Sequence, residues 1–392
     1  MKRSTDRILT THVGSLPRPD DLRAMILKKQ QGERIDEAGF AARVKSAVAE
    51  VVRRQGEAGI DILADGEMGR IGFIPYVNER LAGIEPSPTA EGATYWGTSR
   101  EYRAFPEFYA WAAQMPGTAG QTGRTRWVCT GPVSYKGLAA LQGDIATLKA
   151  ALAGVRHEEA FMPAVSPANL ANWNRNEHYN SEEEYLYALA EALREEYRAI
   201  IDAGLILQVD DPLLASYYVM HPEKSVEDCR SWAVTRVDAL NHALRGLPED
   251  RIRYHTCYSI NIGPRVHDME LKNLVDIMLR INAGAYSFEA ANPRHEHEWK
   301  VWAGLKLPEG KSLIPGVVTH SSNIVEHPEL IAERIGRFAQ AVGKENVIAG
   351  ADCGFASFAA TCEVHPSVVW VKLAALAEGA RIATRELWAK AA

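Results

Sequence analysis

Long apolar runs and clusters of basic charge are both absent from this sequence. No stretch of the 392 residues approaches the ~20 consecutive apolar residues of a membrane-spanning helix. The N-terminal residues also lack the apolar core of a secretion signal. The net charge is −6 and the Lys and Arg residues are scattered, which disfavours a nucleic-acid groove. We therefore expect a cytoplasmic globular protein that binds neither membranes nor nucleic acid.

Cysteine is scarce as well, with only five residues: Cys129, Cys229, Cys257, Cys353 and Cys362. An odd number in a long chain of a reducing compartment argues against a disulfide framework. Each cysteine is therefore either a small buried apolar residue or a thiolate with a function. We interpret Cys129, Cys229 and Cys362 as structural, because no potential ligands stand at matching positions around them.

The chain is rich in short apolar, β-branched runs that alternate with amphipathic helical patterns. One helical pattern covers 182–204 and ends at Gly204, a favourable C-terminal stop. Such alternation predicts a parallel sheet covered by helices. Nine runs are candidate strands, at 8–15, 60–67, 126–134, 160–167, 205–211, 252–259, 285–290, 313–321 and 346–354.

Eight strand–helix units form a (β/α)₈ TIM barrel, which typically takes ~250 residues. Nine candidates are one too many, and we interpret 126–134 as an insertion hairpin. A doubly wound sheet is the alternative α/β fold, but it normally has a Gly-rich phosphate turn after its first strand, which 12–17 does not provide. We therefore predict a single-domain barrel with insertions over residues 1–392.

Four potential ligands stand at the ends of the last four predicted strands: Cys257, Glu289, His320 and Cys353. They are 32, 31 and 33 residues apart, close to the ~30 residues of one barrel unit. Equal spacing places them at the same height around the carboxyl-end mouth, where barrels carry their chemistry. His255 lies two residues before Cys257 and so on the same strand face.

A tetrahedral donor set follows from these positions: His255, Cys257, Glu289 and Cys353. Two thiolates favour Zn²⁺ over magnesium or calcium. A second tempting cluster, His295 and His297, lies beyond its strand in a loop or early helix. That position favours a solvated or substrate-facing role over a second metal site.

Seven short motifs stand at strand ends along nearly the whole chain. They are THVGSLPRP (11–19), DGEMGR (65–70), QVDDP (208–212), HTCYS (255–259), SFEA (287–290), PGVVTHSS (315–322) and ADCGF (351–355). In this order they resemble the C-terminal catalytic barrel of cobalamin-independent methionine synthases, and the wider group of zinc thiol-alkyltransferases built on that barrel.

The resemblance implies a role for each matching residue. Ser15 contacts the carboxylate of an amino-acid thiol, and Glu67 and Asp210 hold its ammonium group. His320 is the acid–base residue near the methyl-donor nitrogen, with a pKa near the working pH. The zinc ligands implied are His255, Cys257, Glu289 and Cys353.

The implied function is zinc-dependent transfer of a methyl or alkyl group to a small-molecule thiol such as homocysteine. Complete methionine synthases of this class have a second, N-terminal barrel that helps to form the folate cleft. This chain resembles the catalytic barrel alone, which leaves the donor open. Asp211, where the family usually has Glu, and the segment 292–302 also depart from the family pattern.

Two alternatives remain. The chain also resembles epoxyalkane:coenzyme M transferase, in which a zinc-bound thiol opens an epoxide. Glu67 and Asp210 favour homocysteine, since an ammonium-bearing thiol needs acidic partners and a sulfonate thiol prefers cations. A non-catalytic, zinc-stabilised binding protein is the other alternative, but structural zinc usually staples domains smaller than this one. The oligomeric state stays open.

Overall fold

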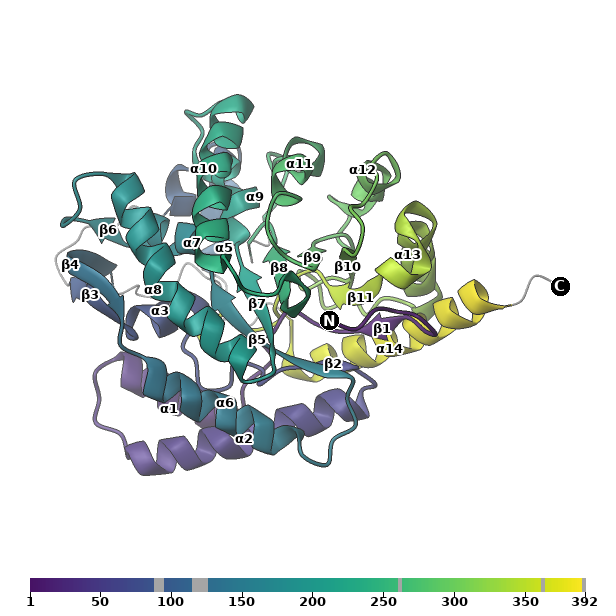
Figure 1. The fold of residues 1–392 in the computed structure, drawn as a ribbon, viewed down its shortest axis with the longest axis horizontal. Coiled ribbons are helices and arrows are strands. Elements are labelled where there is room, and N and C mark those ends of the chain that lie inside the picture. Colours follow the sequence, from purple (N-terminus) through teal and green to yellow (C-terminus); the bar gives the residue numbers. More distant parts are fainter. Residues whose placement is uncertain (88–94, 115–125, 260–262, 361–363, 390–392) are drawn as a thin grey trace.

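A parallel sheet of eight strands forms the centre of the protein (Figure 1). The computed structural model describes residues 1–87, 95–114, 126–259, 263–360 and 364–389. The strands follow the order β1-β11-β10-β9-β8-β7-β5-β2. Their bounds are β1 (Leu9–Thr10), β2 (Ile62–Leu63), β5 (Glu159–Val165), β7 (Ile206–Asp210), β8 (Ile252–Thr256), β9 (Ala285–Phe288), β10 (Ser312–Val318) and β11 (Ile348–Ala351).

Thr10 and Asp61 join the two ends of this strand order. The Asp61 amide donates a hydrogen bond to the Thr10 carbonyl at 3.2 Å. The Thr10 amide donates in turn to the Asp61 carboxylate at 2.9 Å. The sheet is thus nearly closed, which confirms the predicted (β/α)₈ barrel and excludes the doubly wound alternative.

Helices surround the barrel (Figure 1). The long α8 shows why they form: the Ser181 side chain caps its first turn by accepting from the Glu184 amide at 3.1 Å. Leu186, Leu189 and Leu193 then recur at helical spacing and are fully buried. The helices are α1 (Asp20–Gln30), α2 (Glu37–Glu57), α3 (Phe73–Asn78), α4 (Arg100–Ala104), α5 (Pro106–Ala112), α6 (Leu138–Leu152), α7 (Pro167–Trp173), α8 (Glu182–Asp202), α9 (Pro212–Met220), α10 (Val226–Leu244), α11 (Val275–Met278), α12 (Trp299–Ala303), α13 (Pro328–Val342) and α14 (Pro366–Trp388).

The ninth candidate strand lies outside the barrel. β4 (Arg126–Tyr135) pairs antiparallel with β3 (Leu81–Ser87) and parallel with the short β6 (Arg175–Asn176) in a separate three-stranded sheet. The interpretation of 126–134 as an insertion is therefore confirmed.

The barrel interior changes from apolar to polar towards the carboxyl ends of the strands. Apolar side chains such as Leu9, Ile206 and Ile348 form one buried cluster within the barrel. Farther along β8, the Arg253 guanidinium donates to the Gln208 side chain at 2.7 Å and to the Thr11 hydroxyl at 2.9 Å. Such a polar layer supports the mouth, where the predicted site residues lie.

The first two barrel strands are shorter than the sequence predicts, because their polar ends turn away from the sheet. The backbone is left-handed at Gly66 and Glu67, with φ of 66° and 57°. Gly14 has φ of 135°, and a Cβ there would lie 2.7 Å from Pro163 Cγ. The residues that leave the ladder form loops at the mouth.

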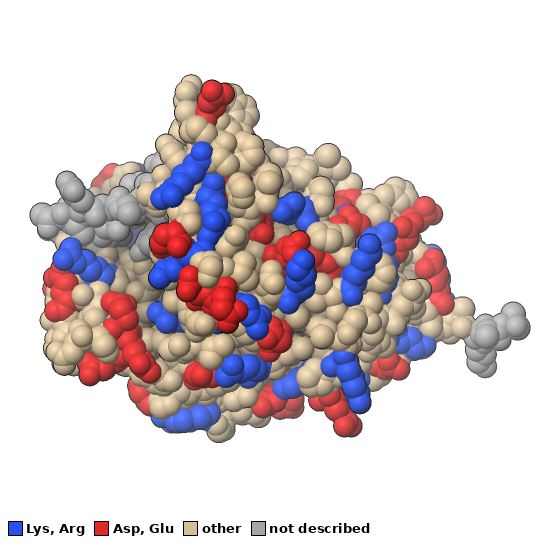
Figure 2. All heavy atoms as spheres, turned by 90° about the horizontal axis from the view of Figure 1, so that it is seen from above, with Lys and Arg blue, Asp and Glu red and all other residues tan. Residues whose placement is uncertain are grey.

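Among the described residues, none of the helices combines the length and apolar character needed to cross a membrane. The face of the molecule in Figure 2 carries acidic and basic side chains intermixed.

Candidate metal centre at the barrel mouth

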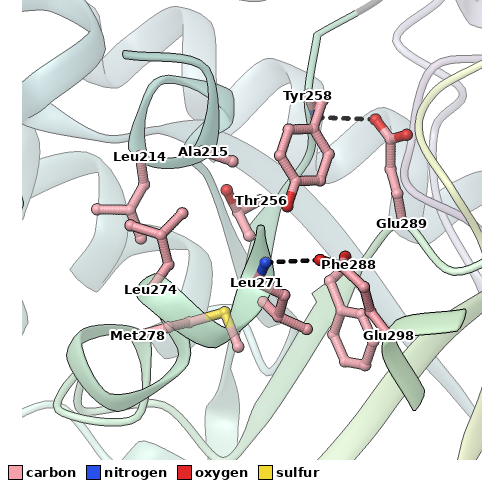
Figure 3. Close-up of a pocket in the computed structure, with 10 residues that line it drawn as sticks. All are labelled: Leu214, Ala215, Thr256, Tyr258, Leu271, Leu274, Met278, Phe288, Glu289 and Glu298. Atoms are coloured by element: carbon pink, nitrogen blue, oxygen red, sulfur yellow. Dashed lines mark hydrogen bonds between the residues drawn. The ribbon is translucent and has the colours of Figure 1, made fainter. Parts of the chain in front are cut away.

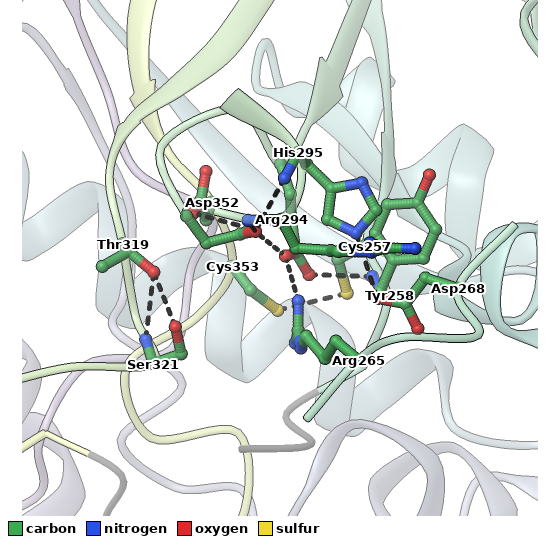
Figure 4. Close-up of polar contacts among 12 residues, drawn as sticks. Cys257, Tyr258, Arg265, Asp268, Arg294, His295, Thr319, Ser321, Asp352 and Cys353 are labelled. Carbon is green, nitrogen blue, oxygen red and sulfur yellow. Dashed lines mark hydrogen bonds and ion pairs between the residues drawn. The ribbon is translucent and has the colours of Figure 1, made fainter. Parts of the chain in front are cut away.

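Three of the four predicted ligands lie together. Potential ligand atoms of His255, Cys257 and Cys353 all lie within 4.8 Å of one another, and the three residues are buried. His255 and Cys257 share the inner face of the chain because they are two residues apart. Cys353 follows the end of β11, and its sulfur lies 3.3 Å from that of Cys257 (Figure 4). An imidazole and two thiols in reach of one another suit zinc.

His255 is oriented by a hydroxyl group on the neighbouring strand. Its Nδ1 lies 3.0 Å from the Ser287 Oγ. Its Nε2 is buried and has no hydrogen-bond partner among the described residues. Burial, together with the charge of Arg253 and the nearby His320, lowers the pKa of His255 to about 3. The ring is therefore neutral near pH 7, the state in which imidazole binds metal.

Glu289, the fourth predicted ligand, is not a member of this three-residue group. Its Oε2 accepts hydrogen bonds from the Arg265 guanidinium at 2.5 Å and from the Asn292 side chain at 2.7 Å. Its Oε1 accepts from the Tyr258 amide at 2.8 Å (Figure 3). The carboxylate thus lies at the mouth, held by protein donors.

A second group of potential ligands consists of Glu289, His320 and Asp352, all buried. Asp352 Oδ1 accepts from the amides of Ala290 and Ala291 at 2.7 and 2.8 Å, which ties the loop after β9 to the end of β11. Burial and the Arg265 charge lower the pKa of His320 to about 3. His320 is therefore neutral near pH 7, in contrast to the expectation of a pKa near the working pH.

Ser15 lies against the loop that carries Cys353. Its carbonyl accepts from the Phe355 amide at 3.0 Å. A Cβ on Gly354 would lie 2.0 Å from the Ser15 hydroxyl oxygen, so only glycine permits this close approach. Ser15 thus lies beside the loop that carries Cys353, and the contact with a substrate carboxylate that the resemblance implies stays a prediction.

Glu67 and Asp210 are two buried acids whose charges influence each other. Burial, and then the charge of Glu67, raises the pKa of Asp210 well above its usual range. Burial also raises the pKa of Glu67, against the charges of Arg70 and Arg18. Glu67 Oε2 is buried without a hydrogen-bond partner among the described residues. A bound cation would relieve the repulsion between the two carboxylates.

His295 is buried, which contradicts the expected solvated or substrate-facing role. Its Nε2 lies 3.0 Å from Asp268 and its Nδ1 lies 2.9 Å from Glu298. The ring stacks on Tyr258 at 3.8 Å between centroids. Tyr258 and Thr256 line a pocket with apolar side chains (Figure 3), on the side of the chain opposite His255 and Cys257. His295 therefore packs on Tyr258, on the side of the chain that faces away from His255 and Cys257. His297 is exposed.

The remaining cysteines lie elsewhere. Cys129 in β4 and Cys229 in α10 are buried and free, and neither belongs to a group of potential metal ligands among the described residues. Cys362 lies outside the described residues.

Sequence reasoning missed several residues of the site. Asp352 directly precedes Cys353, so its position inside a ligand motif was an available signal. Asn292 follows Glu289 by three residues. Arg265 stands in a loop without periodicity, and nothing in the sequence marks it.

The sequence is similar to those of known proteins. The family model described as "Cobalamin-independent synthase, Catalytic domain" matches residues 8–105 and 122–375. The chain is 25% identical to a methionine synthase of Thermococcus kodakarensis, over 96% of this chain and 94% of that protein. It is 26% identical to a 5-methyltetrahydropteroyltriglutamate–homocysteine methyltransferase of Thermotoga petrophila, over 88% of this chain and only 41% of that protein.

Solved structures show the same fold. A B12-independent methionine synthase from Shewanella sp. W3-18-1, in complex with selenomethionine, has a TM-score of 0.71 at 19% identity, covering 98% of this chain and 100% of that one. A second such protein, from Listeria monocytogenes, has a TM-score of 0.65 at 19% identity.

Proposed function

Since the chain belongs to the family of cobalamin-independent synthase catalytic domains, we propose that it transfers a methyl group to the thiol of homocysteine at a zinc centre. The observation that carries the proposal is the buried group of His255, Cys257 and Cys353. The unpartnered Nε2 of His255 supports it, because a buried ring nitrogen without a hydrogen bond is costly unless a metal or water binds it. Glu289 is the proposed fourth ligand.

When bound, zinc favours deprotonation of the substrate thiol and leaves its sulfur nucleophilic. The protein then has to hold the amino-acid end of homocysteine. Ser15 is proposed to contact the carboxylate. Glu67 and Asp210 are proposed to hold the ammonium group, whose positive charge offsets two buried carboxylates. Burial of these groups excludes water and strengthens each interaction.

Transfer requires a balanced exchange of bonds and protons. The homocysteine sulfur loses its proton and forms a bond to the methyl carbon, while the bond from that carbon to the donor nitrogen breaks. The donor nitrogen takes up a proton. We propose that the neutral His320 ring takes up the proton released by the thiol and passes it to the donor nitrogen, with Asp352 as the nearby charge that favours the protonated ring.

The test is an assay for methionine. Zinc-loaded protein is incubated with homocysteine and 5-methyltetrahydropteroyltriglutamate, the donor in the name of the Thermotoga relative, and methionine is measured by mass spectrometry. Methionine that forms only with zinc-loaded protein, and not with the Cys257→Ser variant, supports the proposal. Zinc-loaded protein that binds homocysteine but gives no methionine refutes this donor.

A specific observation favours the second candidate, epoxide opening by coenzyme M. Arg18 is buried near Glu67 and Arg70, and its Nε and Nη2 have no hydrogen-bond partner among the described residues. Such a guanidinium suits the sulfonate of coenzyme M. Coenzyme M and epoxypropane therefore form the second arm of the assay, with the thioether product measured. Zinc bound without turnover in either arm would support a non-catalytic binding protein.

A further inference from the structure

Arg265 contacts Glu289 at the mouth, and its backbone has a conformation that ordinary residues rarely adopt. Its φ is 57°, and that of Ser259 is 68°. The guanidinium is buried and donates to Glu289 at 2.5 Å and to the Ser259 carbonyl at 2.7 Å. In Figure 4 it lies beside the two sulfurs of Cys257 and Cys353. Left-handed backbone at non-glycine residues persists where the surroundings enforce it, and it gathers at functional sites.

Glu289 has a complete set of partners in this position. Its Oε1 is bound by the Tyr258 amide, and its Oε2 by Arg265 and Asn292. Tyr258, whose amide binds Glu289, directly follows Cys257 in the chain, so the carboxylate is close to the three-donor group without belonging to it. Glu289 thus lies on Arg265, next to the group formed by His255, Cys257 and Cys353.

We propose that Arg265 is the exchange partner of Glu289. The carboxylate binds the metal when no thiol is present, and it pairs with Arg265 when the sulfur of the substrate takes its place. The inference rests on the proposed function, because it assumes a metal and a thiol at this site. Arg265 is then a positioning residue, which acts on the reaction through Glu289.

The physical reason is the cost of an unpaired buried charge. A carboxylate released from a metal inside the protein needs another cation, since a buried charge without a partner is strongly unfavourable. Arg265 provides that cation, since its guanidinium lies 2.5 Å from the Glu289 carboxylate. Exchange between two paired states makes an oxygen ligand easy to displace.

The experiment compares Arg265→Gln, Arg265→Lys and the control Arg294→Gln. Arg294 belongs to the same region, but it is exposed and donates to the Val266 carbonyl instead. Zinc content, the Kd for homocysteine, and zinc-edge X-ray absorption with and without homocysteine are measured for each protein. In wild type and in the Arg294 variant, one oxygen or nitrogen ligand gives way to sulfur when homocysteine is added.

We expect Arg265→Gln to bind one zinc per chain but to have a Kd for homocysteine raised roughly tenfold or more. Arg265→Lys keeps the positive charge but lacks the forked guanidinium that binds both Glu289 and Ser259. The Kd for homocysteine should therefore rise less in this variant than in Arg265→Gln. In a Glu289→Gln background, Arg265→Gln should have no further effect on the Kd, because the displaced charge is gone.

Two results overturn the inference. One is unchanged homocysteine affinity in a zinc-loaded Arg265→Gln protein. The other is loss of zinc from Arg265→Gln or Arg265→Lys, which would make Arg265 a support of the metal site itself. If Arg265→Gln fails to fold, the test uses Arg265→Lys in the wild-type and Glu289→Gln backgrounds: its Kd for homocysteine should rise in the first and stay unchanged in the second. Wild-type protein without zinc would instead refute the proposed function, so the two failures are distinguishable.

Discussion

His255 and Ser287 are directly opposite each other in the register of strands β8 and β9, and the Nδ1 of His255 lies 3.0 Å from the Ser287 Oγ. A hydrogen bond from Nδ1 to the hydroxyl fixes one tautomer and leaves the lone pair of Nε2 for a metal. Two residues that the sequence separates by 32 positions are thus made neighbours by strand pairing.

Ser287→Ala is expected to lower zinc affinity about 10-fold to 100-fold, the usual effect of removing the group that orients a ligand histidine. The fold should be retained because the hydroxyl contributes little buried area. Zinc affinity is measured by competition with a chromophoric chelator. Ser216→Ala is the matched control, since that hydroxyl donates to the Pro212 carbonyl within α9. Equal zinc affinities of the two variants would contradict the role of Ser287.

Cys257→Ser and Cys353→Ser should each abolish stoichiometric zinc binding, because two thiolates make this a zinc site. Metal analysis of the purified proteins measures the effect. Cys229→Ser changes a buried cysteine of α10 outside the metal group and should keep one zinc per chain. Full zinc retention in either site variant would refute the proposed ligand set.

His295 predicts a pH dependence of stability. Burial opposes its charge, but the hydrogen bonds that its ring donates to Asp268 and Glu298 raise its pKa to about 9, above the ordinary 6.5. The folded protein therefore holds more protons than the unfolded chain between these values. The resulting contribution is complete below about pH 6.5 and is lost as pH rises through about 9.

His295→Phe keeps a ring to stack on Tyr258 but cannot titrate. Urea unfolding of wild type should show a loss of about 3 kcal/mol between pH 6 and pH 10 that the variant lacks at this position. A loss of the same size in both proteins would show that other groups cause it.

Much of the fold could be predicted because strand–helix alternation is a local pattern. The apolar runs that became β5, β7, β8 and β10 carry their own burial signal. The insertion 126–134 could be recognised only as one strand too many, since its antiparallel partner β3 lies across a long connection. The early ends of β1 and β2 depend on left-handed backbone at the mouth, which no periodicity reveals.

The part of the candidate site that lies on the strand ends could be predicted from the regular spacing of the barrel units. One-unit spacing identified Cys257, Glu289 and Cys353 as neighbours at one height. The ion pair between Glu289 and Arg265 could not be predicted, because Arg265 reaches the mouth through a loop of irregular conformation. The burial of His295 was also missed, since one of its two acidic partners, Asp268, comes from a separate segment.

Gly316 should be intolerant of a side chain. A Cβ there would lie 2.1 Å from the Asp352 Oδ1 and 2.6 Å from its backbone nitrogen, at an irregularity in the β10–β11 register. Gly316→Ala is expected to cost about 1–3 kcal/mol of unfolding free energy, typical of overpacking. Gly336→Ala in α13 is the control: its Cβ would meet nothing within 4 Å, and stability should rise by about 0.5–1 kcal/mol. Equal effects of the two substitutions would refute this packing.

Glu67→Gln tests how the amino-acid end of the substrate is recognised. Glu67 is buried beside Asp210 and Gly14, where a Cβ on Gly14 would approach its Oε1 to 3.0 Å. Removing its charge should raise the Kd for homocysteine at least tenfold, since a charge-assisted hydrogen bond to the ammonium group is lost. Zinc content should not change.

The chemical control is 4-mercaptobutyrate, which has the thiol and carboxylate but no ammonium group, and its Kd should stay the same or fall. If the Kd values for homocysteine and 4-mercaptobutyrate rise equally, Glu67 shapes the pocket and does not bind the ammonium group.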